Sequence, residues 1–250
     1  MLRQSSSLDI SCKRLLTDAL FSWVLLGVFF VDLFLLTQYF FESMSADSLF
    51  NQLKHPNPAM RQRAIAQIVE TQDDTTIPKL MDAIGEEDTV YRRAAVKTLG
   101  RIGTDAVPAI VEQMLNSEND TVRASCTKAM AQIAVQHPNQ PFPSEGLEGL
   151  RRAMEDPYPV VQIASVMSLG EIGQPAVDTL LEALKTTDNV AIALTITNTL
   201  GSIGDPRAVD VLKELIADES VDSYVKETAE SALPRLEQMI TMGNVKGGDR

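Results

Sequence analysis

One short pattern recurs along the chain and strongly limits what it can fold into. It is clearest at residues 90–103, VYRRAAVKTLGRIG. When the copies are aligned on the apolar residue before the glycine, they centre on the following positions: Ile68, Leu99, Met130, Leu169, Leu200 and Leu233. The steps are 31, 31, 39, 31 and 33 residues, and the long step holds an irregular insertion at 136–146, QHPNQPFPSEG. A near-constant period of this size indicates a repeat architecture.

Each copy is preceded by another stretch whose apolar residues lie three and four positions apart, as in 76–84 (TIPKLMDAI) and 176–184 (AVDTLLEAL). This spacing predicts an amphipathic helix. One pair of such helices cannot bury its apolar face alone, but stacked pairs bury a continuous core. We therefore predict an all-α fold, an α-α superhelix of about six helix pairs of the HEAT-like repeat type. It covers residues 46–238, and a polar disordered tail follows at 239–250.

Punctuating residues predict where the helices begin and end. Prolines are expected in the first turns of the leading helices, where they cost little, at Pro78, Pro108, Pro175 and Pro206. Aspartates are expected to cap the second helices, at Asp88, Asp120, Asp156, Asp188 and Asp222. Glycines are expected to mark the ends of the second helices, at Gly100, Gly103, Gly170, Gly173, Gly201 and Gly204.

The first 43 residues are a different kind of polypeptide. Residues 19–41 are almost entirely apolar, with Asp32 as the single charge, and are long enough to span a bilayer. If they form an anchor, the basic residues that precede them place the N-terminus in the cytoplasm and the repeats outside. The segment could instead be a signal peptide, although no A-x-A site follows it. Met44, just before the repeats, is a third possibility as the true start.

Composition excludes some classes of function. The chain carries 22 Lys and Arg against 34 Asp and Glu, a net charge of -12, which disfavours nucleic acid as a partner. The two cysteines, Cys12 and Cys126, are too few for a disulfide framework or a metal cluster. Cys126 occupies a repeat position filled by small residues, so core packing is expected rather than a reactive thiol. No nucleophile–base arrangement or phosphate-binding loop is present, so the chain has no self-contained catalytic centre.

Stacking converts each repeat position into a row in space. Arg61, Arg92 and Arg123 share one position and predict a basic row. These arginines could pair with turn acids and cap carbonyls, or they could capture carboxylates. Arg93 has no counterpart in its own row, so Tyr91, Arg92 and Arg93 are the best surface candidates. In the insertion, Phe142 is expected either under the loop or in a contact patch.

Four segments carry a family resemblance. They are GEEDTVYRRAAVKTLGRIG, FPSEGLEGLRRAMEDPYPVVQIASVMSLGEIG, LLEALKTTDNVAIAL and ADESVDSYVKETAESALPRLE. The sequence resembles the HEAT-like subunits of phycobilin lyases over residues 46–238. The hydrophobic segment 1–43 has no counterpart in that family, which favours Met44 as the start.

The resemblance implies a subunit that helps attach an open-chain tetrapyrrole, expected to be phycoerythrobilin, to a cysteine of an apo-phycobiliprotein. The bilin is then a transferred substrate, with no cofactor bound permanently. The implied partners are a larger HEAT-like lyase subunit of the Y type, forming a heterodimer, and apo-phycoerythrin subunits. Propionates call for Arg or Lys and pyrrole N–H groups call for a carboxylate. The candidate contacts are Asp88, Tyr91, Arg92, Arg93, Arg123, Phe142 and Tyr158.

Two other functions use the same repeats. One is a non-catalytic chaperone for apo-phycobiliprotein subunits, and the other is a scaffold or adaptor in phycobilisome turnover. For all three we expect a cytoplasmic protein associated with phycobilisomes or thylakoids. An anchor in residues 1–43 would place the repeats on the wrong side of the membrane for this role.

Overall fold

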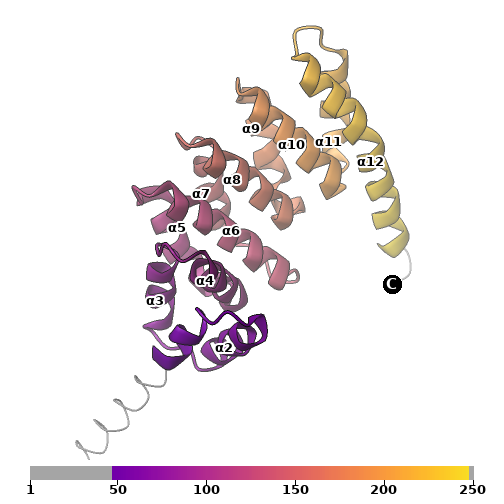
Figure 1. The fold of residues 1–250 in the computed structure, drawn as a ribbon. Coiled ribbons are helices and arrows are strands. Elements are labelled where there is room, and N and C mark those ends of the chain that lie inside the picture. Colours follow the sequence, from indigo (N-terminus) through magenta and orange to yellow (C-terminus); the bar gives the residue numbers. More distant parts are fainter. Residues whose placement is uncertain (1–46, 248–250) are drawn as a thin grey trace, which may run out of the picture. The chain divides into compact units, whose positions relative to one another are not determined.

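The computed structural model describes residues 47–247, with side chains as far as Met242. Within this range, the residues from Gln52 onward belong to one compact unit. Every regular element in the described part is helical, and residues 47–52 are also helical (Figure 1). The leading helices are α3 (Thr76–Ala83), α5 (Val107–Asn116), α7 (Ser144–Ala153), α9 (Val177–Thr186) and α11 (Arg207–Ala217). Two 3-10 turns, η1 (Thr104–Ala106) and η2 (Gln174–Ala176), precede α5 and α9. The second helices are α2 (Pro58–Glu70), α4 (Thr89–Ile102), α6 (Asp120–Gln136), α8 (Pro159–Ile172), α10 (Val190–Ile203) and α12 (Ser223–Gly247).

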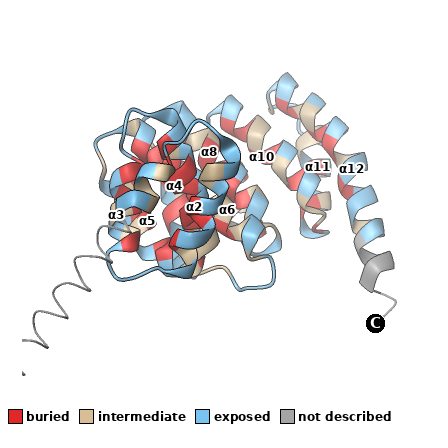
Figure 2. Cartoon of the chain, turned by 60° about the horizontal axis from the view of Figure 1, so that its bottom comes forward, coloured by how far each residue is buried: buried red, intermediate tan, exposed pale blue. Residues whose placement is uncertain are grey.

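The second helices stack in chain order, each against the next, and together with their leading helices they form the predicted repeat solenoid. Five of the six residues used to align the repeats form the core between them, whereas Leu233 of the last copy is only half-buried and Leu236 is the fully buried leucine of α12. Ile68 is 3% exposed, while Leu99, Met130, Leu169 and Leu200 are fully buried. Figure 2 shows this buried strip along the facing sides of the helices. The predicted all-α fold is therefore confirmed.

The six glycines expected at helix ends have two different roles. Gly103, Gly173 and Gly204 do end α4, α8 and α10, with φ of 93°, 79° and 79°, a region that glycine adopts without steric cost. The prediction is wrong for Gly100, Gly170 and Gly201, which lie inside the helices. A Cβ atom on Gly201 would lie 2.8 Å from the Cβ atom of Ala232 in α12. These glycines allow neighbouring second helices to approach closely.

The capping residues are partly those predicted. The carboxylate of Asp88 accepts hydrogen bonds from the backbone N–H groups of Val90 and Tyr91, and Asp222 accepts one from Tyr224. The caps of α6 and α10 are Asn119 and Asn189, each one residue from the predicted aspartate. Asparagine and aspartate serve this position equally well, so the sequence does not distinguish adjacent candidates. Asp156 does not cap α8, because its carboxylate accepts from the backbone N–H of Tyr158 in the turn before the helix and pairs with Arg123.

The last helix continues past the predicted end of the solenoid. Residues 239–247, expected to be a disordered tail, are the final turns of α12. One reason is packing, because the Cβ atom of Met239 lies beside Gly204 at the end of α10. Among residues 47–247, no helix combines the length and apolar character that crossing a bilayer requires. The apolar segment 19–41 and Met44 lie outside the described residues.

Candidate binding groove

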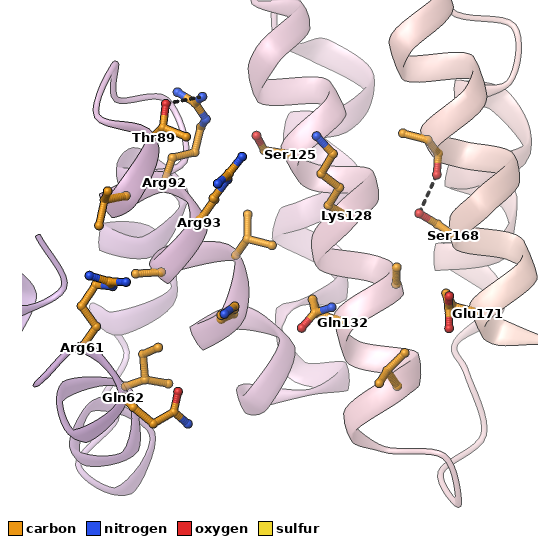
Figure 3. Close-up of a pocket in the computed structure, with 18 of the residues that line it drawn as sticks. Arg61, Gln62, Thr89, Arg92, Arg93, Ser125, Lys128, Gln132, Ser168 and Glu171 are labelled. Carbon is orange, nitrogen blue, oxygen red and sulfur yellow. Dashed lines mark hydrogen bonds between the residues drawn. The ribbon is translucent and has the colours of Figure 1, made fainter. Parts of the chain in front are cut away.

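A groove of about 700 Å³ runs across the second helices α2, α4, α6 and α8. This volume is in the range of small-molecule sites, about 300–1,000 Å³. Successive second helices contribute equivalent positions to its wall, because the repeats place them side by side. Polar side chains reach into it from all four helices, as Figure 3 shows.

Basic side chains dominate the charge in the groove. Arg93 and Lys97 lie one turn apart on α4 and Lys128 lies on α6, all three exposed. Arg61 and Arg92 complete the lining cations (Figure 3). The chain as a whole has a net charge of -12. A concentration of positive charge on an acidic protein indicates a site for an anionic ligand.

Exposed apolar side chains border the groove on α6 and α8. The side chain of Met167 is 60% exposed, and Val135 at the end of α6 is 48% exposed. Glu171, one turn after Met167, is the single carboxylate among the residues that line the groove. The groove therefore offers cations on α4 and α6, and apolar surface with one carboxylate on α8.

The predicted basic row has a structural use. The guanidinium of each arginine donates to a carbonyl oxygen six residues earlier, Arg61 to His55, Arg92 to Glu86 and Arg123 to Ser117, at 2.6–2.8 Å. In the next repeat Gln162 replaces arginine and donates to the carbonyl of Asp156 at 2.7 Å. These bonds tie each second helix to the turn before it. A hydrogen-bond donor at this position therefore holds the turn in place, and two of the arginines, Arg61 and Arg92, also line the groove.

Arg123 additionally joins two repeats. Its Nε atom lies 2.7 Å from Oδ2 of Asp156, and its Nη2 atom donates to Oδ1 at 3.0 Å. Both side chains are nearly buried, at 8% and 7% exposed. Tyr158 stacks on the guanidinium, with 5.3 Å from Arg123 Cζ to the ring centre. Arg123 and Tyr158 thus form a clamp between α6 and the turn before α8, outside the groove lining.

The cluster predicted around residues 88–93 divides between two sides of α4. Tyr91 is buried, with Lys54 Nζ 4.4 Å from its ring centre. Burial, and then the negative charges of Glu86 and Asp82, raise the pKa of Tyr91. Asp88 is occupied as the cap of α4. Only the two arginines of this cluster, Arg92 and Arg93, line the groove.

Phe142 is half-buried under the insertion loop. A Cβ atom on Gly146 of α7 would lie 2.7 Å from the Phe142 ring, which shows how closely ring and helix pack. Cys126 is fully buried, and desolvation raises the pKa of its thiol to about 12. A thiol that keeps its proton is a poor nucleophile. Both residues therefore have packing roles.

Sequence reasoning missed several groove residues, namely Lys97, Lys128, Gln132, Met167 and Glu171. A signal was available in the repeat positions. Lys97, Lys128 and Met167 each lie two residues before an alignment position, on the same exposed face as Arg93. Reading each exposed repeat position across all copies, rather than single unusual residues, would have found them.

Comparison with known proteins gives a family. The profile of HEAT repeats matches residues 46–131 and 147–234. The chain is 52% identical over 196 residues to the uncharacterized phycocyanin operon protein Z of Pseudanabaena tenuis (strain PCC 7409), covering 78% of this chain and 97% of that protein. It is 26% identical over 182 residues to the bilin biosynthesis protein CpeZ of Synechococcus sp. (strain WH8020), covering 70% and 97%.

Solved structures with similar folds include the CpcE–CpcF complex of phycocyanin lyase from Nostoc sp. PCC7120. That match has 18% identity and a TM-score of 0.43, and it covers 63% of this chain and 98% of that one. A designed armadillo repeat protein in complex with the peptide (KR)4 matches with a TM-score of 0.41 and 14% identity, covering 76% and 98%. From the repeat profile and the relative at 52% identity, we conclude that the chain belongs to the HEAT-repeat family, in the group that includes phycocyanin operon protein Z.

Proposed function

We propose that this chain is a subunit of a phycobilin lyase, and that its groove holds an open-chain tetrapyrrole, with phycoerythrobilin as the first candidate, during attachment to an apo-phycobiliprotein. The observation that carries the proposal is the cationic, partly apolar groove on a strongly acidic chain. The sequence relationship to a bilin biosynthesis protein along nearly its whole length supports it.

The chemistry of the groove suits such a ligand. Each of the two propionates of a bilin can accept charge-assisted hydrogen bonds from Arg93, Lys97 or Lys128. The conjugated rings can lie against the exposed apolar side chains of Val135 and Met167. A groove that is open along one side also leaves part of the bilin accessible to a second macromolecule.

The proposed reaction places few demands on this chain. A cysteine thiol of the acceptor protein adds across the ethylidene double bond of the bilin A ring. A sulfur–carbon bond forms at the outer carbon, and the thiol proton ends on the ring carbon, so no group leaves and nothing is oxidised. Holding both reactants in register can contribute several kcal/mol to such a step, roughly 7–11 in well-oriented intramolecular reactions. A binding surface without its own nucleophile therefore suffices.

The proposal includes two protein partners. One is a larger HEAT-like lyase subunit, with which this chain forms a heterodimer. The other is the apo-phycobiliprotein, with an apo-phycoerythrin subunit as the first candidate. We place the complex in the cytoplasm beside the phycobilisome, where the acceptor proteins are made.

Co-expression tests this function. Apo-phycoerythrin subunits, the larger lyase subunit and this chain are produced together in a host that makes phycoerythrobilin, and covalent pigment is measured on denaturing gels. The unaltered chain is expected to increase pigment severalfold over its omission. The Arg93→Ala, Lys97→Ala, Lys128→Ala triple variant is expected to lose most of that gain, because the propionate contacts are removed. Lys213→Ala, on exposed α11 away from the groove, serves as the matched control.

Equal pigment from the triple variant and the control would reject the groove as the bilin site. Equal pigment with and without the chain would reject the lyase role itself.

A chaperone for apo-phycobiliprotein subunits is the second candidate, and one feature favours it. Helix α10 contains no charged residue, and α8 contains only Glu171. Nevertheless Val160 on α8 is 62% exposed and Val190 at the start of α10 is 39% exposed. Uncharged, exposed apolar surface of this kind suits contact with another protein. In the same co-expression, more soluble apo-subunit without more covalent pigment would identify this role.

A further inference from the structure

The charges in the groove are separated in space. The cations Arg93 and Lys97 are on α4 and Lys128 is on α6, whereas the carboxylate of Glu171 is on α8. Figure 3 shows Arg93 and Glu171 on opposite sides of the α6 helix. No ion pair joins Glu171 to any residue in the described part of the chain. The groove thus presents a positive side and one carboxylate that no neighbouring cation neutralises.

An open-chain tetrapyrrole has a matching polarity. The propionates project from one edge of its two central rings, and the ring nitrogens lie on the opposite edge. When a bilin is protonated, its N–H groups share a positive charge. Propionates directed to α4 and α6 therefore leave the nitrogen edge toward α8, which is the only orientation that pairs both edges with opposite charge.

We propose that Glu171 accepts hydrogen bonds from the pyrrole N–H groups of the bound bilin and so sets the direction in which the bilin lies in the groove. This inference rests on the proposed function. Glu171 is exposed and lies one turn beyond Met167, so its carboxylate borders the apolar surface on which the rings would rest. Glu171 is a positioning residue for the bilin, and no bond is made or broken at it.

The other charged groups around Glu171 determine how its removal would change the protonation of a bound bilin. Of the helices packed against α8, α6 contributes Lys128 to the groove, α10 carries no charge, and no charged residue of α7 or α9 lines the groove. The remaining lining charges are Arg61, Arg92, Arg93 and Lys97. All of these cations oppose protonation of a bound bilin, and Glu171 alone favours it.

The absorption spectrum of the bilin reports this contact without requiring the attachment reaction, because protonation shifts its long-wavelength band. Phycoerythrobilin is bound to the purified full chain, alone and with the larger lyase subunit, and the spectrum is recorded as pH rises. The unaltered protein and Glu112→Gln are expected to keep the bilin protonated to the same pH; Glu112 is an exposed residue of α5 outside the groove. In Glu171→Gln the midpoint is expected to fall by about one pH unit or more.

The affinity for bilin is expected to fall less than tenfold in Glu171→Gln, because the propionate contacts remain. Identical titration midpoints for Glu171→Gln and Glu112→Gln, with bilin still bound, would overturn the role of Glu171 and leave the proposed function intact. Failure of the unaltered protein to bind bilin in either form would overturn the proposed site, and the inference with it.

Discussion

Arginine side chains on the second helices show how one residue type takes two roles on one surface. The arginines at the repeat position of Arg92 donate a hydrogen bond to a carbonyl oxygen six residues earlier and stabilise the turn. Arg93 itself is exposed and lines the groove. The difference follows from helix geometry, since a shift of one residue rotates a side chain by about 100°.

This geometry also explains which candidate residues could be predicted. The sequence left the arginine row open between structural pairing and carboxylate capture. The structure shows the carbonyl contact in four successive units, from Arg61 to Gln162, and Ala193 lacks the side chain to make it in the next.

The different locations of Asp88, Tyr91 and Arg93 could not be predicted from the sequence. Their proximity in the chain places them at one helix start but does not show which face of the helix each occupies. The groove cations Lys97 and Lys128 were missed because each looks like an ordinary surface lysine when it is considered alone.

Cys126 leads to a prediction about stability and pH. Burial raises the pKa of its thiol to about 12, against 9.0 without burial. Between these values the unfolded chain has lost the thiol proton while the folded chain keeps it, so the free energy of unfolding falls as pH rises. The stability advantage of the unaltered protein over Cys126→Ala is expected to shrink by about 1 kcal/mol between pH 8 and pH 10.

Urea denaturation at several pH values measures this difference, and Cys12 is present in both proteins. A constant difference across this range would mean that the thiol is not shielded from water as described.

At the scale of elements, glycines determine how closely the second helices approach. Gly100, Gly170 and Gly201 face Gln132, Thr199 and Ala232 of the next second helix. A sequence pattern of glycine three residues before another glycine does not reveal which one ends the helix. Both roles exclude a side chain, one through backbone conformation and the other through a neighbouring helix. The sequence alone therefore does not show which glycine of each pair contacts the neighbouring helix and which one ends its own helix.

Substitutions separate these two roles. Gly201→Ala is expected to lower the free energy of unfolding by about 1–3 kcal/mol, because the new methyl group meets the Cβ atom of Ala232. Gly173→Ala has open space around it and is expected to cost about 1–3 kcal/mol through its φ of 79° alone. Ala232→Gly is then expected to restore part of the loss in the first variant and none in the second. Thermal or urea denaturation of each pair measures this, and equal rescue would contradict the assignment.

At the scale of the whole described solenoid, fold and repeat boundaries were predictable because the same apolar positions recur in each unit. The exact caps and the end of α12 were not, since they depend on single contacts such as that of Met239 with Gly204. The groove depends on several repeats at once. Its existence required the spatial arrangement of α2 through α8, which no single repeat contains.

The 39-residue step makes one junction in the stack different from the others. Arg123 and Asp156 bridge it with two hydrogen bonds between nearly buried groups. In a repeat protein each unit contacts mainly its neighbours, so weakening one junction loosens the coupling between the two sides. Arg123→Ala is expected to destabilise the protein by about 2–4 kcal/mol, because it leaves the Asp156 carboxylate without its partner.

Amide hydrogen exchange measures which helices lose stability in the Arg123→Ala variant. Faster exchange is expected in α6 and α8, with α12 much less affected. The double variant Arg123→Ala, Asp156→Ala is expected to recover part of the stability, since no unpaired charge remains. A uniform increase in exchange along the chain would contradict a local junction.

The separation of packing positions from groove positions on each second helix has a consequence for how such proteins diversify. Leu99 and Met130 are fully buried and hold the stack together, whereas Arg93, Lys97 and Lys128 are exposed and take no part in the core. The exposed positions can therefore be substituted one at a time without loss of the packing that stabilises the fold. Related proteins can thus share one architecture and differ only in the side chains that line the groove.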